Sequence, residues 1–387
     1  MNRRIQSQAL IRPMRAVALA IFLLGFAGQC KVNSDCADAG DPGCSKLLAL
    51  FWLKILKPRY YYATDQSGFV LQYSVNLDTG ALTAIAPKLP VTGASTITTD
   101  VNGKYAYIQN TNTTITQMKI TQGSGELVDL GSQAIAATTL SGVSYDALQR
   151  FVFVSSSGGA GTIVTMRPSL STGLLTPIQS FNPALICTNT KGVAPHPSGK
   201  FLYCGNATTI GSLVIDGNTG ALSSGPSTPG VTGSIYDITF DSTGNFLFLI
   251  SSTNAESYAV NQTTGTLTLR SSIALAGGVY SIVSIGNNVY AGGGGLRQFS
   301  YDPGTGVLTL IGTNASPGAN PLAIAAEAQG KFVYAMNPAG GILFTFARNS
   351  DGTLTTMNPT AGVTLGGVMI AGTMSSPINQ IFAADQF

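Results

Sequence analysis

Alternating apolar and polar residues recur along residues 60–387 in short runs that are separated by glycine-containing turns. The runs are rich in β-branched and aromatic residues and are bounded by Gly, Asn or Asp, which is the composition of β-strands. One type of run recurs as RYYYATD, GKYAYIQN, QRFVFVSS, GKFLYCGN, GNFLFLIS, NNVYAGG and GKFVYAMN. Long amphipathic helical patterns are absent from the sequence after residue 58, so the pattern predicts an all-β protein.

A second mark follows each of these runs: a small-residue turn that contains glycine and is followed by leucine. The glycines are Gly80, Gly125, Gly173, Gly220, Gly265, Gly306 and Gly352, spaced by 41 to 48 residues. A repeat of about 45 residues with four short strands is typical of a propeller blade. Such a sheet is apolar on both faces and buries them by stacking on neighbours in a ring. Seven repeats therefore predict a seven-bladed β-propeller of four-stranded blades over residues 59–387.

The two ends of the repeat region predict how the ring closes. The first repeat starts at Tyr60 without an innermost strand, and GVMIAGT, residues 367–373, supplies one from the C-terminal side. The final residues, INQIFAADQF at 378–387, have the pattern of another second strand and compete with YYYATD. The sequence leaves open which of the two is used.

The N-terminus has the pattern of an export signal, in which basic residues precede the apolar run AVALAIFLLGFAG. We expect residues 1–29 to be a signal peptide. AGQC resembles the lipobox of bacterial lipoproteins, which implies a lipid anchor on Cys30; a plain secretory signal with unmodified Cys30 is the alternative. Removing residues 1–29 takes away four arginines and no acid, so the net charge moves from +3 to −1. We expect an exported chain on the bacterial outer membrane or cell surface.

Residues 30–58 are expected to be a tether between the anchor and the propeller. Their segment SKLLALFWLKILKP, residues 45–58, predicts a short amphipathic helix that contains Trp52 and ends at Pro58. This helix either lies in the bilayer interface or packs against the propeller.

Composition narrows the classes of partner and of site. Charged residues make up 10% of the chain and form no basic stripe, which excludes nucleic acid as an expected partner.

Besides Cys30 there is an even number of cysteines, which suggests two disulfides in an oxidising compartment. Of the three possible pairings, Cys36–Cys44 with Cys187–Cys204 closes the shortest loops. Metal binding is the rival, but CxxC spacing and a second histidine are lacking. The four cysteines are Cys36, Cys44, Cys187 and Cys204.

The only histidine, His196, invites a catalytic interpretation because imidazole is a common general base near neutral pH. Aligned on the following Gly-Lys-Phe, however, His196 takes the place of a turn acid in other repeats. We therefore expect it to accept turn hydrogen bonds as those acids do, far from a site at the central channel. The sequence contains no phosphate-binding loop or metal cluster, and we expect no cofactor. The turn acids are Asp100, Asp146, Asp241 and Glu327.

GKFLY-type strands combined with TGxL turns resemble the seven-bladed lactonase family related to bacterial 6-phosphogluconolactonase. They are also similar to the YVTN propellers of surface layers. The first resemblance implies the propeller fold over residues 59–387 and, in active members, the opening of sugar lactones. Those members carry Pro-Arg-His at the entry to an inner strand and glutamate after a YVxN-type strand, and this sequence lacks both. The positions after that strand are Gln66, Thr111, Ser157, Ala207, Ser252, Gly294 and Pro338.

Four residues near the predicted channel mouth are the remaining candidates for chemistry: Lys191, Tyr236, Asp237 and Tyr280. Tyrosine and aspartate at strand ends more commonly cap and pack. We therefore expect a non-catalytic binding or structural module, with a protein or glycan ligand at a propeller face. The alternative is a lactonase with a rearranged site that uses Lys191 or Asp237. A quinone- or metal-dependent dehydrogenase propeller would need histidines that the chain lacks.

Overall fold

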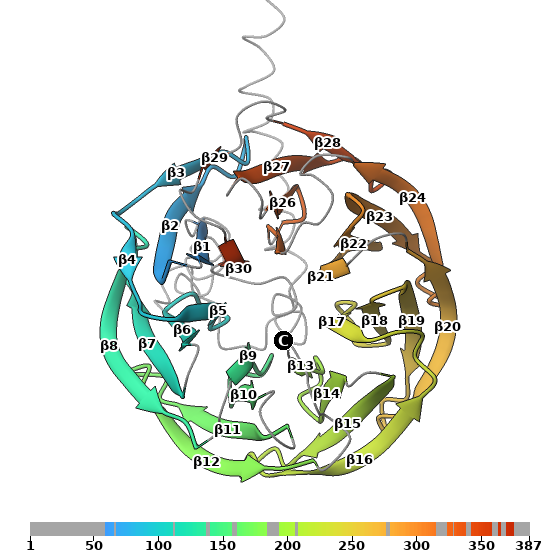
Figure 1. Cartoon of the computed structure of the whole chain (residues 1–387), viewed down its shortest axis with the longest axis horizontal. Coiled ribbons are helices and arrows are strands. Elements are labelled where there is room, and N and C mark those ends of the chain that lie inside the picture. Colours follow the sequence, from blue (N-terminus) through green and yellow to red (C-terminus); the bar gives the residue numbers. More distant parts are fainter. Residues whose placement is uncertain are drawn as a thin grey trace, which may run out of the picture. The chain divides into compact units, whose positions relative to one another are not determined.

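The computed structural model describes residues 59–65, 67–110, 113–136, 140–156, 161–183, 193–205, 208–275, 279–314, 323–327, 329–337, 342–357, 363–364 and 369–374. All of these residues belong to one compact unit, Pro58–Phe387. Within it, strands β1 to β30 form seven antiparallel sheets arranged in a ring (Figure 1). The predicted seven-bladed, all-β propeller is therefore confirmed.

Each blade is named in chain order, and its strands run from the centre of the ring outward. Blade 1 contains β30 (Met369–Met374), β1 (Arg59–Asp65), β2 (Phe69–Val75) and the outer strands β3 (Leu82–Ala84) and β4 (Leu89–Pro90). Blade 2 contains β5 (Ala94–Thr99), β6 (Tyr105–Asn110), β7 (Thr114–Ile120) and β8 (Leu127–Ala134). Blade 3 contains β9 (Leu140–Tyr145), β10 (Val152–Ser156), β11 (Ile163–Pro168) and β12 (Leu175–Phe181).

Blades 4 to 7 follow the same order. Blade 4 contains β13 (Val193–Pro195), β14 (Phe201–Gly205), β15 (Thr209–Ile215) and β16 (Leu222–Pro229). Blade 5 contains β17 (Ile235–Phe240), β18 (Phe246–Ser251), β19 (Asn254–Val260) and β20 (Leu267–Ala274). Blade 6 contains β21 (Val279–Ile285), β22 (Asn288–Gly293), β23 (Leu296–Tyr301) and β24 (Leu308–Asn314). Blade 7 contains β25 (Ile324–Ala326), β26 (Phe332–Asn337), β27 (Ile342–Arg348) and the outer strands β28 (Leu354–Thr356) and β29 (Val363–Thr364).

The ring closes by combining both ends of the repeat region in blade 1. Strand β30 pairs antiparallel with β1, with Tyr61 opposite Met374 and Ala63 opposite Gly372. The predicted inner strand at 367–373 is confirmed to within two residues, and YYYATD is used as the second strand. Residues 378–387 lie outside the described residues.

Apolar clusters between neighbouring blades form the core of the propeller. Cys204 and Leu213 of blade 4, for example, pack with Phe151 and Phe153 of blade 3. One such cluster lies at each junction between consecutive blades, including the junction of blade 7 with blade 1. Each sheet therefore buries both of its faces against neighbours, which is why a single blade cannot fold alone.

The repeated glycine of each turn packs against the preceding blade. Gly265, in the turn between β19 and β20, has a φ of +75°, and a Cβ added there would lie 2.8 Å from the ring of Phe201 on β14. The other six glycines also have positive φ, and a Cβ on any of them would lie 2.0 to 2.6 Å from a residue within one position of the start of the preceding blade's second strand. That residue is aromatic in six blades and Asn288 in blade 6. The two repeated marks therefore contact each other across every junction.

Tyrosine hydroxyls strengthen the same contact. Two residues after the one that contacts the glycine, blade 4 has Tyr203, and its hydroxyl donates a hydrogen bond of 2.8 Å to the carbonyl oxygen of Gly265. Tyr62, Tyr107, Tyr290 and Tyr334 make the corresponding bonds at 2.6 to 3.1 Å. Blades 3 and 5 carry Phe153 and Phe248 at this position, which have no hydroxyl to donate.

Exchanging tyrosine and phenylalanine at this position should change stability in opposite directions. Tyr203→Phe is expected to lower the free energy of unfolding by about 1 kcal/mol, because the buried Gly265 carbonyl loses its side-chain donor. Phe248→Tyr should raise it by up to about 1 kcal/mol by supplying a donor to Gly306. Urea unfolding of both variants measures the two effects. A Phe248→Tyr variant as destabilised as Tyr203→Phe would show that the hydroxyl does not account for the difference.

Candidate functional site

The two ends of the blades differ in how regular their connections are. At one end, which we call the turn face, a first-to-second-strand turn with the same pair of backbone hydrogen bonds begins at Asp100, Asp146, His196, Asp241 and Glu327. The glycine turns between third and fourth strands lie at this end too, because the sheets are antiparallel. At the opposite end, the loop face, the connections that the structure describes in full range from two residues (252–253) to five (230–234). The loop face is therefore the variable surface of the scaffold.

His196 has the structural role that its alignment predicts. Its side chain is fully buried, and its Nδ1 accepts a hydrogen bond of 3.1 Å from the Ser198 backbone N–H. Asp100 and Asp241 accept backbone N–H groups in the equivalent turns of blades 2 and 5. His196 adds a contact that an ionised acid cannot make, since its Nε2 donates to the Gly244 carbonyl of blade 5 at 2.8 Å. A neutral ring protonated on Nε2 satisfies both bonds.

Burial lowers the pKa of His196 below its ordinary value of 6.5, and the nearby charge of Lys200 acts in the same direction. The Gly244 carbonyl and Asp241 act in the opposite direction without reversing the shift. A proton on Nδ1 would face the Ser198 N–H, so the folded chain favours the neutral ring. The imidazole ring of His196 is enclosed by Phe201, Tyr203 and Phe240. A fully enclosed ring has no access to substrate, and His196 is not a catalytic candidate.

This shift makes stability depend on pH. Below about pH 6.5 the unfolded chain takes up a proton on His196 that the folded chain does not, so stability falls as the pH falls, by at most about 1.4 kcal/mol per pH unit. His196→Asn removes this contribution. The stability advantage of the wild type over the variant should therefore shrink between about pH 8 and about pH 5, as followed by urea unfolding. A difference that stays constant across this range would contradict the assignment.

Asp237 is the one predicted candidate whose side-chain surroundings are defined in detail. It lies on β17, one of the inner strands around the centre of the ring (Figure 1), and is partly buried. Its Oδ1 accepts the Ile238 N–H at 2.9 Å, and its Oδ2 accepts the Ile282 N–H of blade 6 at 3.0 Å. Burial raises the pKa of Asp237 to about 6, although these amides and the Ser281 hydroxyl act to lower it.

Ser281 extends this contact into blade 7. Its hydroxyl oxygen accepts the Ile324 N–H at 3.2 Å, so Asp237, Ser281 and Ile324 link the inner strands of blades 5, 6 and 7. Strand register places Ser281 at the position in blade 6 that Asp237 takes in blade 5. The sequence reasoning missed Ser281, and only a register comparison between these two repeats would have found it.

The other predicted residues do not complete a site around Asp237. Tyr236 packs into the apolar cluster between blades 5 and 6. Tyr280 lies on β21, but its side chain falls outside the described part of the structure, as does all of Lys191. Among the described residues, Asp237 has no ion-pair partner.

Cys204 is disulfide-bonded, and its partner lies outside the described residues. Cys30, Cys36, Cys44 and Cys187 also lie outside them. The lipidation of Cys30 and the disulfide pairing therefore remain predictions.

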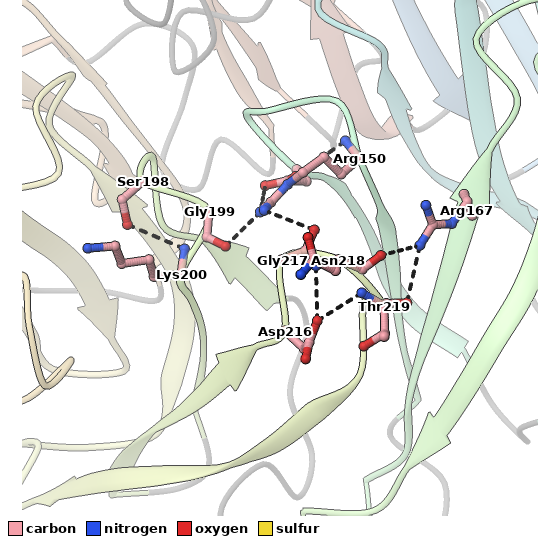
Figure 2. A network of polar contacts seen from close by, with 10 residues as sticks. Arg150, Arg167, Ser198, Gly199, Lys200, Asp216, Gly217, Asn218 and Thr219 are labelled. Carbon is pink, nitrogen blue, oxygen red and sulfur yellow. Dashed lines mark hydrogen bonds and ion pairs between the residues drawn. The ribbon is translucent and has the colours of Figure 1, made fainter.

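Two arginines that the sequence reasoning did not single out, Arg150 and Arg167, take part in a polar network at the turn face (Figure 2). Arg150 pairs with Asp146 at 2.8 Å and donates to the Gly199 carbonyl of blade 4 at 2.6 Å. Arg167 donates to the Asn218 carbonyl of the same blade at 2.7 Å. Both guanidinium groups lie near the ring of Phe151, at 5.2 and 5.3 Å from its centroid. These contacts join blades 3 and 4 where Phe153 provides no hydroxyl.

Neither a metal site nor a membrane-spanning helix is found in the part of the chain that the structure describes. No three His, Cys, Asp or Glu side chains come together there as a metal site. Within the same residues, no helix is long and apolar enough to cross a bilayer.

Solved structures share the fold of this chain at low sequence identity. A Bacteroides fragilis protein provisionally assigned as a 6-phosphogluconolactonase matches with a TM-score of 0.73 and 17% identity, over 82% of this chain and 98% of its own. The periplasmic gluconolactonase PpgL of Pseudomonas aeruginosa matches with a TM-score of 0.71 and 17% identity, over 82% and 98%. No family model matches the chain, and no curated protein sequence does. The fold is thus that of the lactonase-like propellers.

Proposed function

We propose that this chain is an exported, lipid-anchored propeller that acts as a non-catalytic binding module of the bacterial envelope. The observation that carries the proposal is the contrast between a turn face of repeated geometry and a loop face whose fully described connections range from two to five residues. A rigid scaffold with one variable face is the usual arrangement of binding proteins. The ligand is expected to be a protein or glycan at the loop face.

The surroundings of Asp237 support a structural role for this acid. Both of its carboxylate oxygens accept backbone N–H groups, one of which belongs to the next blade. Opening a lactone also needs a cation or donors for the developing oxyanion. Among the residues that the structure describes, no cationic side chain is paired with Asp237.

Binding can be tested with single substitutions on the two faces. The probe is an array of bacterial envelope polysaccharides, and the protein is the purified full chain. Ser234→Arg changes an exposed residue in the loop-face connection to blade 5, and Thr263→Arg changes an exposed residue at the turn face. We expect the first variant to lose binding and the second to retain it. Equal loss in both variants, or no binding by the wild type, contradicts the proposal.

Lactone hydrolysis is the second candidate function, and the raised pKa of Asp237 favours it. A carboxylate with a pKa of about 6 is ionised at neutral pH and basic enough to take a proton from an attacking water. In that reaction, water adds to the lactone carbonyl and Asp237 accepts its proton. The ring C–O bond then breaks, and Asp237 returns the proton to the departing alkoxide oxygen, which becomes the hydroxyl of the open product. The rate of 6-phosphogluconolactone hydrolysis would then rise with pH through about 6, and Asp237→Asn would abolish the rise.

A further inference from the structure

Blade 3 presents three exposed leucines at the turn face, which we call the leucine tip. Leu148 lies in the turn between β9 and β10, and Leu170 and Leu174 lie in the glycine turn between β11 and β12. Their exposed fractions are 43%, 61% and 44%. Exposed large apolar residues gathered at turns are a feature of surfaces that meet a partner or a membrane.

The leucine tip is confined to blade 3. Where blade 3 has Leu148, other blades have Asn102, Ser198, Thr243 and Gln329. Where it has Leu170, they have Leu77, Gln122, Gly217, Gln262, Pro303 and Ser350. Where it has Leu174, they have Ala81, Glu126, Ala221, Thr266, Val307 and Thr353. The single other leucine, Leu77 of blade 1, packs against the core and is not equally exposed.

Cationic side chains flank the leucine tip. Arg167 and Lys200 are exposed, and Arg150 is partly exposed beside them (Figure 2). Of the acids in the same network, Asp146 is buried against Arg150, and Asp216 accepts two backbone N–H groups of its own turn. Apolar residues surrounded by Arg and Lys suit the interface of a phospholipid bilayer, where phosphates lie above the acyl chains.

The chain also enters the propeller at the turn face. Strand β1 begins at Arg59, which pairs with Val75, and Val75 directly precedes the glycine turn of blade 1. The residues before Arg59, including the predicted anchor Cys30, are therefore joined to this face by the covalent chain. A lipid anchor on Cys30 would therefore be connected to the turn face and not to the loop face.

We propose that the leucine tip docks on the phospholipid bilayer to which the chain is anchored. Leu148, Leu170 and Leu174 enter the interface, and Arg167 and Lys200 contact lipid phosphates. The loop face then points away from the membrane and is open to its ligand. This inference rests on the membrane attachment in the proposed function and adds to it the surface that meets the lipid.

Tryptophan fluorescence of the full chain on vesicles tests this orientation. In a Trp52→Phe background, Leu170→Trp places a single reporter in the leucine tip, and Ser350→Trp places one at the matched, exposed position of blade 7. The vesicles contain phosphatidylethanolamine and phosphatidylglycerol, with or without brominated acyl chains. Leu170→Trp should shift its emission to shorter wavelength and lose intensity with the brominated lipid. Ser350→Trp should show neither change.

Vesicle flotation separates this proposal from the proposed function. If the chain floats with vesicles but the emission of Leu170→Trp is unchanged, the leucine tip does not meet lipid, and a protein partner becomes the better explanation. Equal quenching at both positions also overturns the proposal, because the docking would then not be specific to blade 3. A chain that does not float contradicts the membrane attachment itself.

Discussion

Gly125→Ala is expected to lower the free energy of unfolding by about 3 kcal/mol or more. The turn holds Gly125 at a φ of +80°, which costs an L-residue about 1–2 kcal/mol. The new Cβ would also lie 2.3 Å from the ring of Tyr60, so blades 1 and 2 would have to move apart. Overpacking of this kind adds about 1–3 kcal/mol.

Gly123→Ala in the same turn is the matched control. Gly123 also has a positive φ, +98°, but a Cβ there meets no atom within 4 Å. Urea unfolding of both variants therefore separates the backbone cost from the contact with Tyr60. The expected order is wild type, then Gly123→Ala, then Gly125→Ala as the least stable. Equal stability of the two variants would contradict the aromatic–glycine contact as a determinant of the fold.

Truncation after Thr364 is expected to abolish cooperative unfolding. It removes β30, and β1 then has no inner neighbour in the ring. The exposed edge of β1 contains Tyr61 and Ala63, which are buried in the intact propeller. An open ring loses blade 1 as a complete sheet, and propeller blades depend on their neighbours for burial. Calorimetry and near-UV circular dichroism should show a broad transition or none.

Truncation after Met374 is the control for this experiment. It keeps β30 and removes only residues 375–387, which include the competing segment INQIFAADQF. We expect this shorter chain to unfold cooperatively with nearly the stability of the full chain. If the control unfolds like the Thr364 truncation, the last thirteen residues contribute to closure and the strand assignment of blade 1 is wrong.

The number of blades could be predicted because each repeat carries the same two marks. The contact between the two marks could not be predicted, because the turn glycine of one blade meets the aromatic strand residue of the preceding blade. Gly265 and Phe201 lie 64 residues apart in the chain, and only the ring brings them into contact. From the sequence, Gly265 is simply a residue of a tight turn. The structure adds a second reason for glycine there, because the ring of Phe201 occupies the space that a side chain would need.

The candidate site was predictable only in part for the same reason. The role of His196 followed from alignment with turn acids, since a turn is local and its geometry repeats. The bond from its Nε2 to Gly244 depends on the next blade and was not foreseen. Asp237 was singled out as a reactive group, but its contacts with Ile282 and Ser281 depend on how blades 5 and 6 pack.

The rate of 6-phosphogluconolactone hydrolysis by the purified full chain tests the central functional claim most directly. If the propeller is a binding module, the rate at neutral pH equals that of buffer alone, and Asp237→Asn changes nothing. Turnover above the buffer rate that is lost in Asp237→Asn, while the variant unfolds like the wild type, would contradict the claim and identify the chain as a lactonase.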